Sequence, residues 1–275
     1  MDVSPQDERR IRELPSALAA GARIAERLAS ATPAVFLDYD GTLTSIVDDP
    51  AAAVLPPATR RSIERLAVRV PVAVVSGRDL RDVKALVGVE GIHYAGSHGF
   101  EVLAPDGTLH RQGEAYLPAL ARGAEALERR IAGDSGAWIE RKTFAIAVHY
   151  HVREDPGVGT RIERAVDEVV AGEPRLRKTG GKRIFELRPA LAWDKGTAVL
   201  SILAMLTRSA REDFVPIYVG DDVTDEDAFR ALRGVGLGVV VEGEEDRGTW
   251  ADYSLPDPDA VRHFLDTLAE LARGA

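Results

Sequence analysis

Short apolar runs alternate with amphipathic segments along most of this chain. The runs are Ala34–Leu37, Val72–Val75, Ile92–Ala95, Val215–Val219 and Val235–Val241. The stretches between them carry apolar residues at helical spacing. Strands that alternate with helices pack as a mostly parallel sheet with helices on its faces. The sequence therefore predicts an α/β fold.

The pattern changes in the middle of the chain. A long helical stretch, Gly113–Ile131, precedes two alternating segments, Trp138–Lys142 and Phe144–Tyr150, which predict a hairpin. A second helix, Thr160–Val170, and two strand-like pieces around the turn Thr179–Gly181 follow. We expect a small α+β domain inserted into the α/β domain. The predicted boundaries are a core of residues 1–110 and 188–275 and an inserted cap of residues 111–187.

Composition narrows the class of protein. The 275 residues carry a net charge of −9 and no cysteine, which excludes disulfides and thiolate metal sites. No Lys/Arg-rich run marks a nucleic-acid binder, and no apolar run approaches the roughly 20 residues that span a bilayer. Residues 1–10 lack the apolar stretch of a secretory signal. We expect a protein of the reducing cytoplasm that binds neither nucleic acid nor membrane.

Two aspartates stand at the end of the first apolar run. Asp38 and Asp40 are two positions apart, so their side chains point to the same side of an extended backbone. Gly41 allows a tight turn, and Thr42 offers a hydroxyl and an N–H to an anion. The carboxyl end of a strand is where open α/β sheets bind ligands. An ordinary acidic turn after a strand is the alternative for this segment taken alone.

Three later segments add polar groups at comparable places. Ser76 and Gly77 follow the second apolar run, Lys195 opens a predicted helix, and Asp221 and Asp222 follow the run Val215–Val219. Each has a plain structural explanation. A serine at a strand end often caps a helix, a lone lysine is usually solvated, and acidic residues favour helix starts. All of them together, at predicted strand ends, favour a phosphate site.

These four segments resemble the motifs of the haloacid dehalogenase superfamily of phosphohydrolases. The resemblance implies a Rossmann-like core in which Asp38 attacks phosphorus and Asp40 acts as acid and then base. It implies Mg²⁺ held by Asp38, Asp40 through its backbone carbonyl, and Asp221, with Asp222 or Asp225 direct or through water. Lys195 would neutralise the phosphate. The implied phosphate-binding residues are Thr42, Ser76, Gly77 and Lys195.

From about Val35 to Leu271 the chain resembles the trehalose-6-phosphate phosphatase family more narrowly. The segments that carry this likeness are Asp38–Leu43, Gly96–Glu101, Ile139–Lys142, Gly181–Pro189 and Gly220–Asp227. The resemblance implies that cap residues bind the sugar hydroxyls. Those residues are Glu140, Lys142, Lys182 and Glu186. Charged residues on a solvated hairpin face are the alternative.

The sequence departs from that family beside His149. The family has an arginine directly after the His-Tyr pair, where this chain has His151. Arg153, two positions further and on the same strand face, is the expected replacement. His149 and His151 also share a strand face and suggest a metal site, but no third ligand is near in sequence. We therefore expect His149 in the polar wall of a sugar pocket.

The expected function is Mg²⁺-dependent hydrolysis of a small sugar phosphate, with trehalose 6-phosphate as the substrate that the resemblance implies. A functional partnership with trehalose-6-phosphate synthase would follow. Three alternatives remain: a phosphatase for sucrose phosphate or glucosylglycerol phosphate, a phosphotransferase, and a non-catalytic partner of the synthase. A decayed enzyme would be expected to lose Asp38, Asp40, Lys195 or Asp221, and all four are present.

Overall fold

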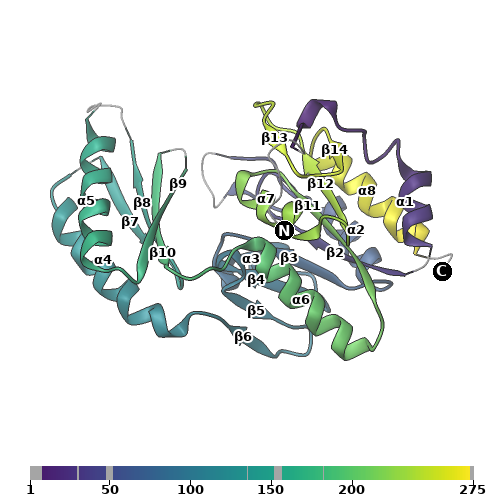
Figure 1. The fold of residues 1–275 in the computed structure, drawn as a ribbon, viewed down its shortest axis with the longest axis horizontal. Helices are drawn as coiled ribbons and strands as arrows, with labels where there is room; N and C mark the ends of the chain where they lie inside the picture. The colour runs from purple at the N-terminus through teal and green to yellow at the C-terminus, as the bar shows by residue number, and fades with distance from the viewer. Residues whose placement is uncertain are drawn as a thin grey trace. The chain divides into compact units, whose positions relative to one another are not determined.

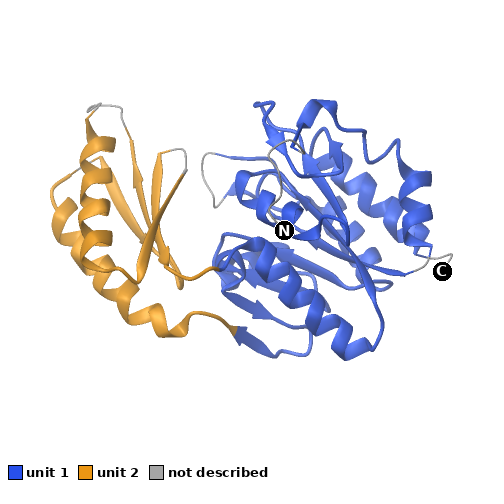
Figure 2. Cartoon of the chain, viewed as in Figure 1, with its two compact units in different colours: residues 1–110, 193–275 blue, residues 111–192 orange. Residues whose placement is uncertain are grey.

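The structure is a computed structural model that describes residues 8–29, 31–47, 52–134, 136–151, 157–181 and 183–272. The chain divides into two compact units (Figure 2). Unit 1 consists of Met1–His110 and Trp193–Ala275, and unit 2 of Arg111–Ala192. The second division lies beyond the expected boundary at 187/188, because strand β10 (Ile184–Pro189) continues past that point.

An eight-stranded sheet forms the centre of unit 1, with the order β14-β12-β11-β2-β3-β4-β5-β6 (Figure 1). The strands from β14 to β4 pair in parallel, and β5 runs antiparallel to β4. This confirms the predicted α/β fold with a mostly parallel sheet. The strands are β2 (Thr32–Leu37), β3 (Val72–Val75), β4 (His93–Gly96), β5 (Glu101–Leu103), β6 (Leu109–Arg111), β11 (Phe214–Gly220), β12 (Leu237–Val241) and β14 (Tyr253–Leu255).

Helices cover both faces of this sheet. Alternate residues of a strand point to opposite faces, so Val35 and Leu37 of β2 pack with α1, α2, α3 and α8. Ala34 and Phe36 pack with α6 and α7 on the other face. Burial on both faces explains why the strands read as continuous apolar runs. The helices are α1 (Gly21–Leu28), α2 (Pro57–Ala67), α3 (Leu80–Val87), α6 (Lys195–Ala210), α7 (Glu226–Leu232) and α8 (Pro258–Leu271).

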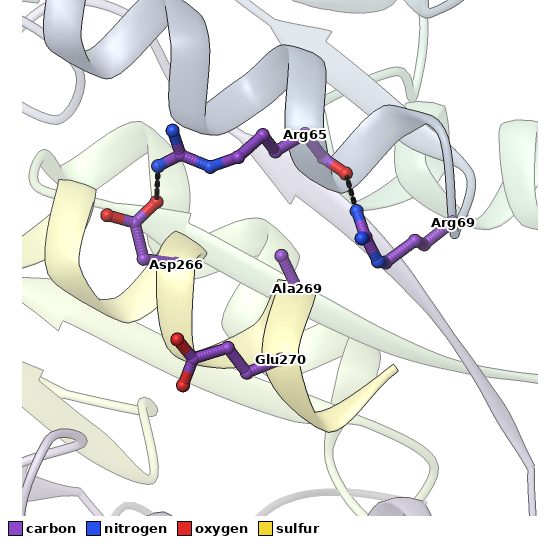
Figure 3. Close-up of a pocket in the computed structure, with 5 residues that line it drawn as sticks. All are labelled: Arg65, Arg69, Asp266, Ala269 and Glu270. Carbon is purple, nitrogen blue, oxygen red and sulfur yellow. Dashed lines mark hydrogen bonds and ion pairs between the residues drawn. The ribbon is translucent and has the colours of Figure 1, made fainter. Parts of the chain in front are cut away.

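Polar contacts accompany the packing of α2 against α8 (Figure 3). Arg65 of α2 forms an ion pair with Asp266 of α8, and the Arg69 guanidinium donates a hydrogen bond to the Arg65 carbonyl oxygen at 2.7 Å. Both members of the ion pair are partly exposed. Such a pair contributes at most about 1 kcal/mol, so the apolar contacts between the helices dominate.

Unit 2 is a four-stranded antiparallel sheet with two helices on one face. The strand order is β7-β8-β10-β9. Ile146, Val148 and Leu187 of the strands form a core with α4 and α5. This is the α+β insertion that the sequence predicts. The elements are α4 (Leu117–Ile131), β7 (Ala137–Arg141), β8 (Ile146–Tyr150), α5 (Val158–Gly172), β9 (Leu176–Gly181) and β10.

Short elements were the hardest to predict. Near the N-terminus, α1 begins only at Gly21, and Pro15 disfavours a helical conformation for the residue before it. Three-residue strands such as β5 and β6 are too short for a periodic signal. The remaining short elements are β1 (Arg9–Arg10), β13 (Gly248–Thr249) and the 3₁₀ turns η2 (Ile11–Glu13), η4 (Ser97–Gly99), η5 (Glu114–Tyr116) and η6 (Val223–Asp225). No helix in the described ranges combines the length and the apolar character needed to cross a membrane.

Candidate active site

Polar residues gather at the carboxyl edge of the central sheet. Strands β11, β2 and β3 are parallel neighbours, so their carboxyl ends meet at one edge. Asp38 follows β2, Ser76 follows β3, and Asp221 follows β11. This is the edge at which open α/β sheets bind ligands.

Lys195 joins two of the carboxylates. Its ammonium donates hydrogen bonds to Asp38 Oδ1 and Asp225 Oδ1, both at 2.7 Å. The side chains of Lys195, Asp38 and Asp225 are only 3%, 6% and 0% exposed. Lys195 opens α6 because Asp194 caps the helix by accepting a hydrogen bond from the Thr197 N–H at 2.7 Å. Lys195 is therefore a buried partner of two carboxylates and not a solvated lysine.

Asp225 is fixed on every side. It ends the 3₁₀ turn η6 after β11, and its Oδ2 accepts hydrogen bonds from the backbone N–H groups of Asp221 and Asp222 at 3.0 and 2.9 Å. Its Oδ1 also accepts a hydrogen bond from the Tyr218 hydroxyl at 2.6 Å. A buried carboxylate with this many donors has one orientation. Asp225 thus holds Lys195 and the turn in place together.

Asp221 completes a cluster of three carboxylates. Its Oδ1 accepts a hydrogen bond from the Thr42 hydroxyl at 3.3 Å. Gly41 has φ +78°, and a Cβ built there would lie 2.1 Å from Asp221 Oδ2, so the turn requires glycine. One ligand oxygen from each of Asp38, Asp221 and Asp225 lies within 4.8 Å of the others. Oxygen ligands at such spacing suit a hard divalent cation.

The charges in this cluster do not balance. Burial raises the pKa of Asp38 well above its ordinary value, although Lys195 opposes the rise. Burial and Asp225 raise the pKa of Asp221 from 3.8 to about 7. Burial alone would lower the pKa of Lys195, but Asp225 and Asp38 raise it above its ordinary value, so the ammonium stays charged. Three carboxylates around one ammonium leave excess negative charge that a cation would neutralise.

Two of the predicted residues have their side chains engaged elsewhere. Both carboxylate oxygens of Asp40 accept hydrogen bonds from Arg78, at 2.7 and 2.6 Å. Asp222 is exposed and accepts a hydrogen bond from the Val223 N–H at 2.7 Å, where it caps η6. The structure therefore places Asp225, and not the side chain of Asp222, with Asp38. The spacing of the acidic run alone could not separate these neighbours.

The predicted phosphate-binding residues lie around the same strand ends. Thr42 and Ser76 are buried, and Ser76 Oγ accepts a hydrogen bond from the Arg78 N–H at 3.1 Å. A Cβ on Gly77 would lie 2.7 Å from the His98 ring, so a larger residue here would have to displace that ring. His98 belongs to the turn Ser97–Gly99, whose three residues all have positive φ. Such strain is uncommon for residues other than glycine and gathers at functional sites.

The predicted sugar-binding residues of unit 2 form pairs. Lys142 donates a hydrogen bond to Glu186 at 2.9 Å, and His149 Nε2 lies 2.9 Å from Glu140 Oε2. Glu186 also forms an ion pair with Arg188. The two other candidates, Arg153 and Lys182, lie outside the described residues.

Ion pairing explains the charge states in unit 2. The hydrogen bond to His149 lowers the pKa of Glu140. Burial would raise the pKa of Glu186, but Arg188 and Lys142 lower it. Within the part of the chain that the structure describes, no close group of three metal-ligating side chains includes His149 and His151. The alternative of a histidine metal site therefore gains no support.

Comparison with known proteins places the chain in a family. The family profile described as trehalose-phosphatase matches residues 36–259. The trehalose-phosphate phosphatase of Mycobacterium tuberculosis is 43% identical, over 98% of this chain and 69% of that protein. A trehalose-6-phosphate phosphatase structure from Aspergillus fumigatus is 27% identical with a TM-score of 0.68, covering 95% of this chain and 100% of that one.

A haloacid dehalogenase-like hydrolase from Bacteroides thetaiotaomicron shares the fold, with a TM-score of 0.60 at 14% identity over 88% of this chain and 99% of that one. The predicted fold class is therefore confirmed. The family match covers most of the chain, including every strand end that carries the carboxylate cluster. This chain belongs to the trehalose-phosphatase family and is a phosphoric monoester hydrolase.

Proposed function

We propose that this chain hydrolyses trehalose 6-phosphate to trehalose and phosphate, through a phosphoryl group carried on Asp38. One observation carries the proposal: a buried carboxylate at the end of β2 is paired with a buried ammonium beside two more carboxylates. The name of the relatives supplies the substrate. The geometry indicates Asp38 as the nucleophile, and the neighbouring Lys195 as the positive charge beside it.

The first step transfers the phosphoryl group to Asp38. A carboxylate oxygen of Asp38 forms a bond to phosphorus while the bond from phosphorus to the sugar oxygen breaks. Lys195 stabilises the negative charge on the phosphoryl oxygens. Thr42, in the loop after β2, and Ser76, directly after β3, would donate hydrogen bonds to the phosphoryl oxygens. The leaving sugar oxygen takes a proton from Asp40 in its acid form.

The second step releases phosphate. Asp40, now a carboxylate, removes a proton from water as the water oxygen attacks phosphorus and the bond to Asp38 breaks. Arg78 orients both oxygens of Asp40, and each oxygen keeps a second lone pair for the proton. Asp38 is regenerated, and free phosphate leaves. Arg78 is thus a positioning residue for the acid–base group.

The carboxylate cluster fits a divalent cation, which we propose to be Mg²⁺. Asp38 and Asp221 would supply oxygen ligands, and Asp225 would either bind the ion directly or orient Lys195 and the turn. When bound, the cation would neutralise the repulsion between the carboxylates and a phosphate dianion. The Asp40 backbone carbonyl remains a proposed ligand of the same ion. The side chain of Asp222 is then left for capping η6.

We assign phosphate chemistry to unit 1 and sugar recognition to unit 2. Glu140, Lys142 and Glu186 lie on β7, the turn after it and β10, and offer charged groups to sugar hydroxyls. Lys182 and Arg153 are further candidates for the same role. A site built to bind hydroxyl groups discriminates strongly against analogues that lack them.

A substrate panel tests this proposal. Phosphate release is measured from trehalose 6-phosphate, sucrose 6-phosphate, glucosylglycerol phosphate and glucose 6-phosphate, with Mg²⁺ or with excess chelator. We expect trehalose 6-phosphate to have the highest kcat/KM and chelator to abolish turnover. A higher kcat/KM for another sugar phosphate would overturn the substrate. Full activity of demonstrably metal-free protein would overturn the role of the cation.

A further inference from the structure

An exposed tryptophan lies on the face of the unit 2 sheet opposite α4 and α5. Helices α4 and α5 lie on one face of this sheet (Figure 1). They pack on it through Ile146, Val148 and Leu187. Trp138 of β7 has the opposite side-chain direction from Ile139, which belongs with that core. The Trp138 residue is 48% exposed. A large aromatic surface is therefore held outside the core of its own unit.

The tryptophan ring is held by its neighbours. Trp138 pairs directly with His149 of β8, and the two rings stack with centroids 4.8 Å apart and an interplanar angle of 9°. The ring of His151 lies 4.9 Å from the Trp138 ring at 44°. Glu140 in turn holds His149 through the 2.9 Å contact with Nε2. Cross-strand neighbours of this kind fix the ring and lower the entropy cost of binding something on it.

Polar groups occupy the next row of the same face. Cross-strand partners share a face, so Glu140, Ala147 and Glu186 form a row beside the row of Trp138 and His149. Lys142 reaches this row through its bond to Glu186. An aromatic plate thus lies beside carboxylate and ammonium groups. A pyranose ring has the matching surfaces, with an apolar C–H face and a rim of hydroxyls.

We propose that Trp138, backed by His149, is the stacking platform for one pyranose ring of the substrate. This inference rests on the proposed function, because the sugar phosphate supplies the ring. Trp138 sets specificity by covering the apolar face of the sugar, while Glu140, Lys142 and Glu186 bind its hydroxyl rim. A phosphate ester without a pyranose gains nothing from the platform.

Kinetics of the full chain test the platform. Trp138→Ala removes the aromatic plate, and Trp138→Phe retains a smaller one. Leu117→Ala is the matched control, since Leu117 is an exposed apolar residue on α4, which packs on the covered face. We expect Trp138→Ala to lower kcat/KM for trehalose 6-phosphate about tenfold, Trp138→Phe to retain most of it, and Leu117→Ala to leave it unchanged. Turnover of p-nitrophenyl phosphate should stay at the wild-type value in all three.

Direct binding is measured in the same chain labelled with 5-fluorotryptophan. The fluorine resonance that Trp138→Phe removes is assigned to Trp138 and followed while trehalose, or mannitol as an open-chain control, is added. We expect trehalose to shift it and mannitol to leave it in place. Wild-type kinetics in Trp138→Ala with an unmoved resonance would overturn the platform. If the wild type prefers another sugar phosphate, the proposed substrate fails, and the same titration with that sugar still decides the role of Trp138.

Discussion

Arg78 binds both carboxylate oxygens of Asp40, with Nε 2.7 Å from Oδ2 and Nη2 2.6 Å from Oδ1. The hydrogen bond to Asp40 raises the pKa of Arg78 above its ordinary value, so the guanidinium is permanently charged. Its planar fork matches a carboxylate in a way that a lysine ammonium does not. Arg78 therefore fixes the orientation of the Asp40 carboxylate. The spacing of Asp38 and Asp40 in the sequence does not reveal this contact.

Arg78→Lys should lower kcat for trehalose 6-phosphate by roughly tenfold to a hundredfold and change KM little, because Asp40 loses its fixed orientation for proton transfer. Steady-state kinetics measure this. Arg81→Lys, an exposed arginine of α3, is the matched control and should behave as wild type. A wild-type kcat in Arg78→Lys would show that Asp40 needs no such support.

Tyr218→Phe should both destabilise the protein and slow turnover. The Tyr218 hydroxyl is buried and donates to Asp225 Oδ1, which also accepts from Lys195. Its removal takes one donor from a buried carboxylate, at a cost of about 1–3 kcal/mol in the free energy of unfolding. Urea denaturation measures the cost, with Tyr253→Phe, a buried tyrosine of β14, as the control. Equal free energies of unfolding for Tyr218→Phe and wild type would show that the hydrogen bond from Tyr218 to Asp225 does not stabilise the fold.

The stability of the metal-free protein should depend on Asp221 and pH. Its pKa is raised from 3.8 to about 7, so the folded state binds a proton that the unfolded state releases between these values. The contribution of Asp221 to the free energy of unfolding should therefore fall as pH rises from about 4 to 7. The comparison is wild type against Asp221→Asn in chelator, because carboxylates away from the cluster titrate alike in both proteins.

The difference between the two unfolding curves should grow toward pH 7 in favour of Asp221→Asn. Saturating Mg²⁺ should reverse that ranking, since it binds the ionised carboxylate of the wild type. A pH-independent difference in chelator would mean that Asp221 is not perturbed in the fold.

Glu140→Gln and Glu186→Gln should separate recognition from stability. Glu140 is half exposed, so Glu140→Gln should raise KM for trehalose 6-phosphate and leave the free energy of unfolding near wild type. Glu186 lies between Lys142 and Arg188, and its loss leaves two largely buried cations unpaired. Breaking such a pair costs about 3–5 kcal/mol. Similar urea midpoints for the two variants would contradict this distinction.

The sheet edge that carries the carboxylate cluster can be predicted from the sequence, because its residues follow apolar strands. Asp38 and Asp221 follow strands, and Lys195 begins a helix. Hydrophobic periodicity and helix-start residues mark such positions well in a sequence. Asp225 and Asp222 could not be separated, because a 3₁₀ turn decides which of them points inward. Tyr218 looked like an ordinary apolar strand residue, and its role depends on a hydroxyl contact across the turn.

The change from strand–helix alternation to a helix followed by a hairpin predicts the inserted domain. It does not predict the C-terminal boundary of that domain. Strand β10 runs on through Pro189, and the division falls after Ala192. The sequence predicts Trp138 on a hairpin strand. The alternation of apolar and polar residues in that strand does not predict which face of the sheet the helices cover. The stacking on His149 depends on cross-strand register, which the sequence alone leaves open.

The central claim is that Asp38 carries the phosphoryl group, and chemical trapping tests it most directly. Enzyme turning over trehalose 6-phosphate with Mg²⁺ is quenched, reduced with borohydride and digested, and the peptides are analysed by mass spectrometry. A phosphoryl group on Asp38 makes its carbonyl reducible, so we expect homoserine at position 38 in the wild type and none in Asp38→Asn, which should be inactive. An unmodified Asp38 peptide under turnover, together with near wild-type activity of Asp38→Asn, would contradict the account.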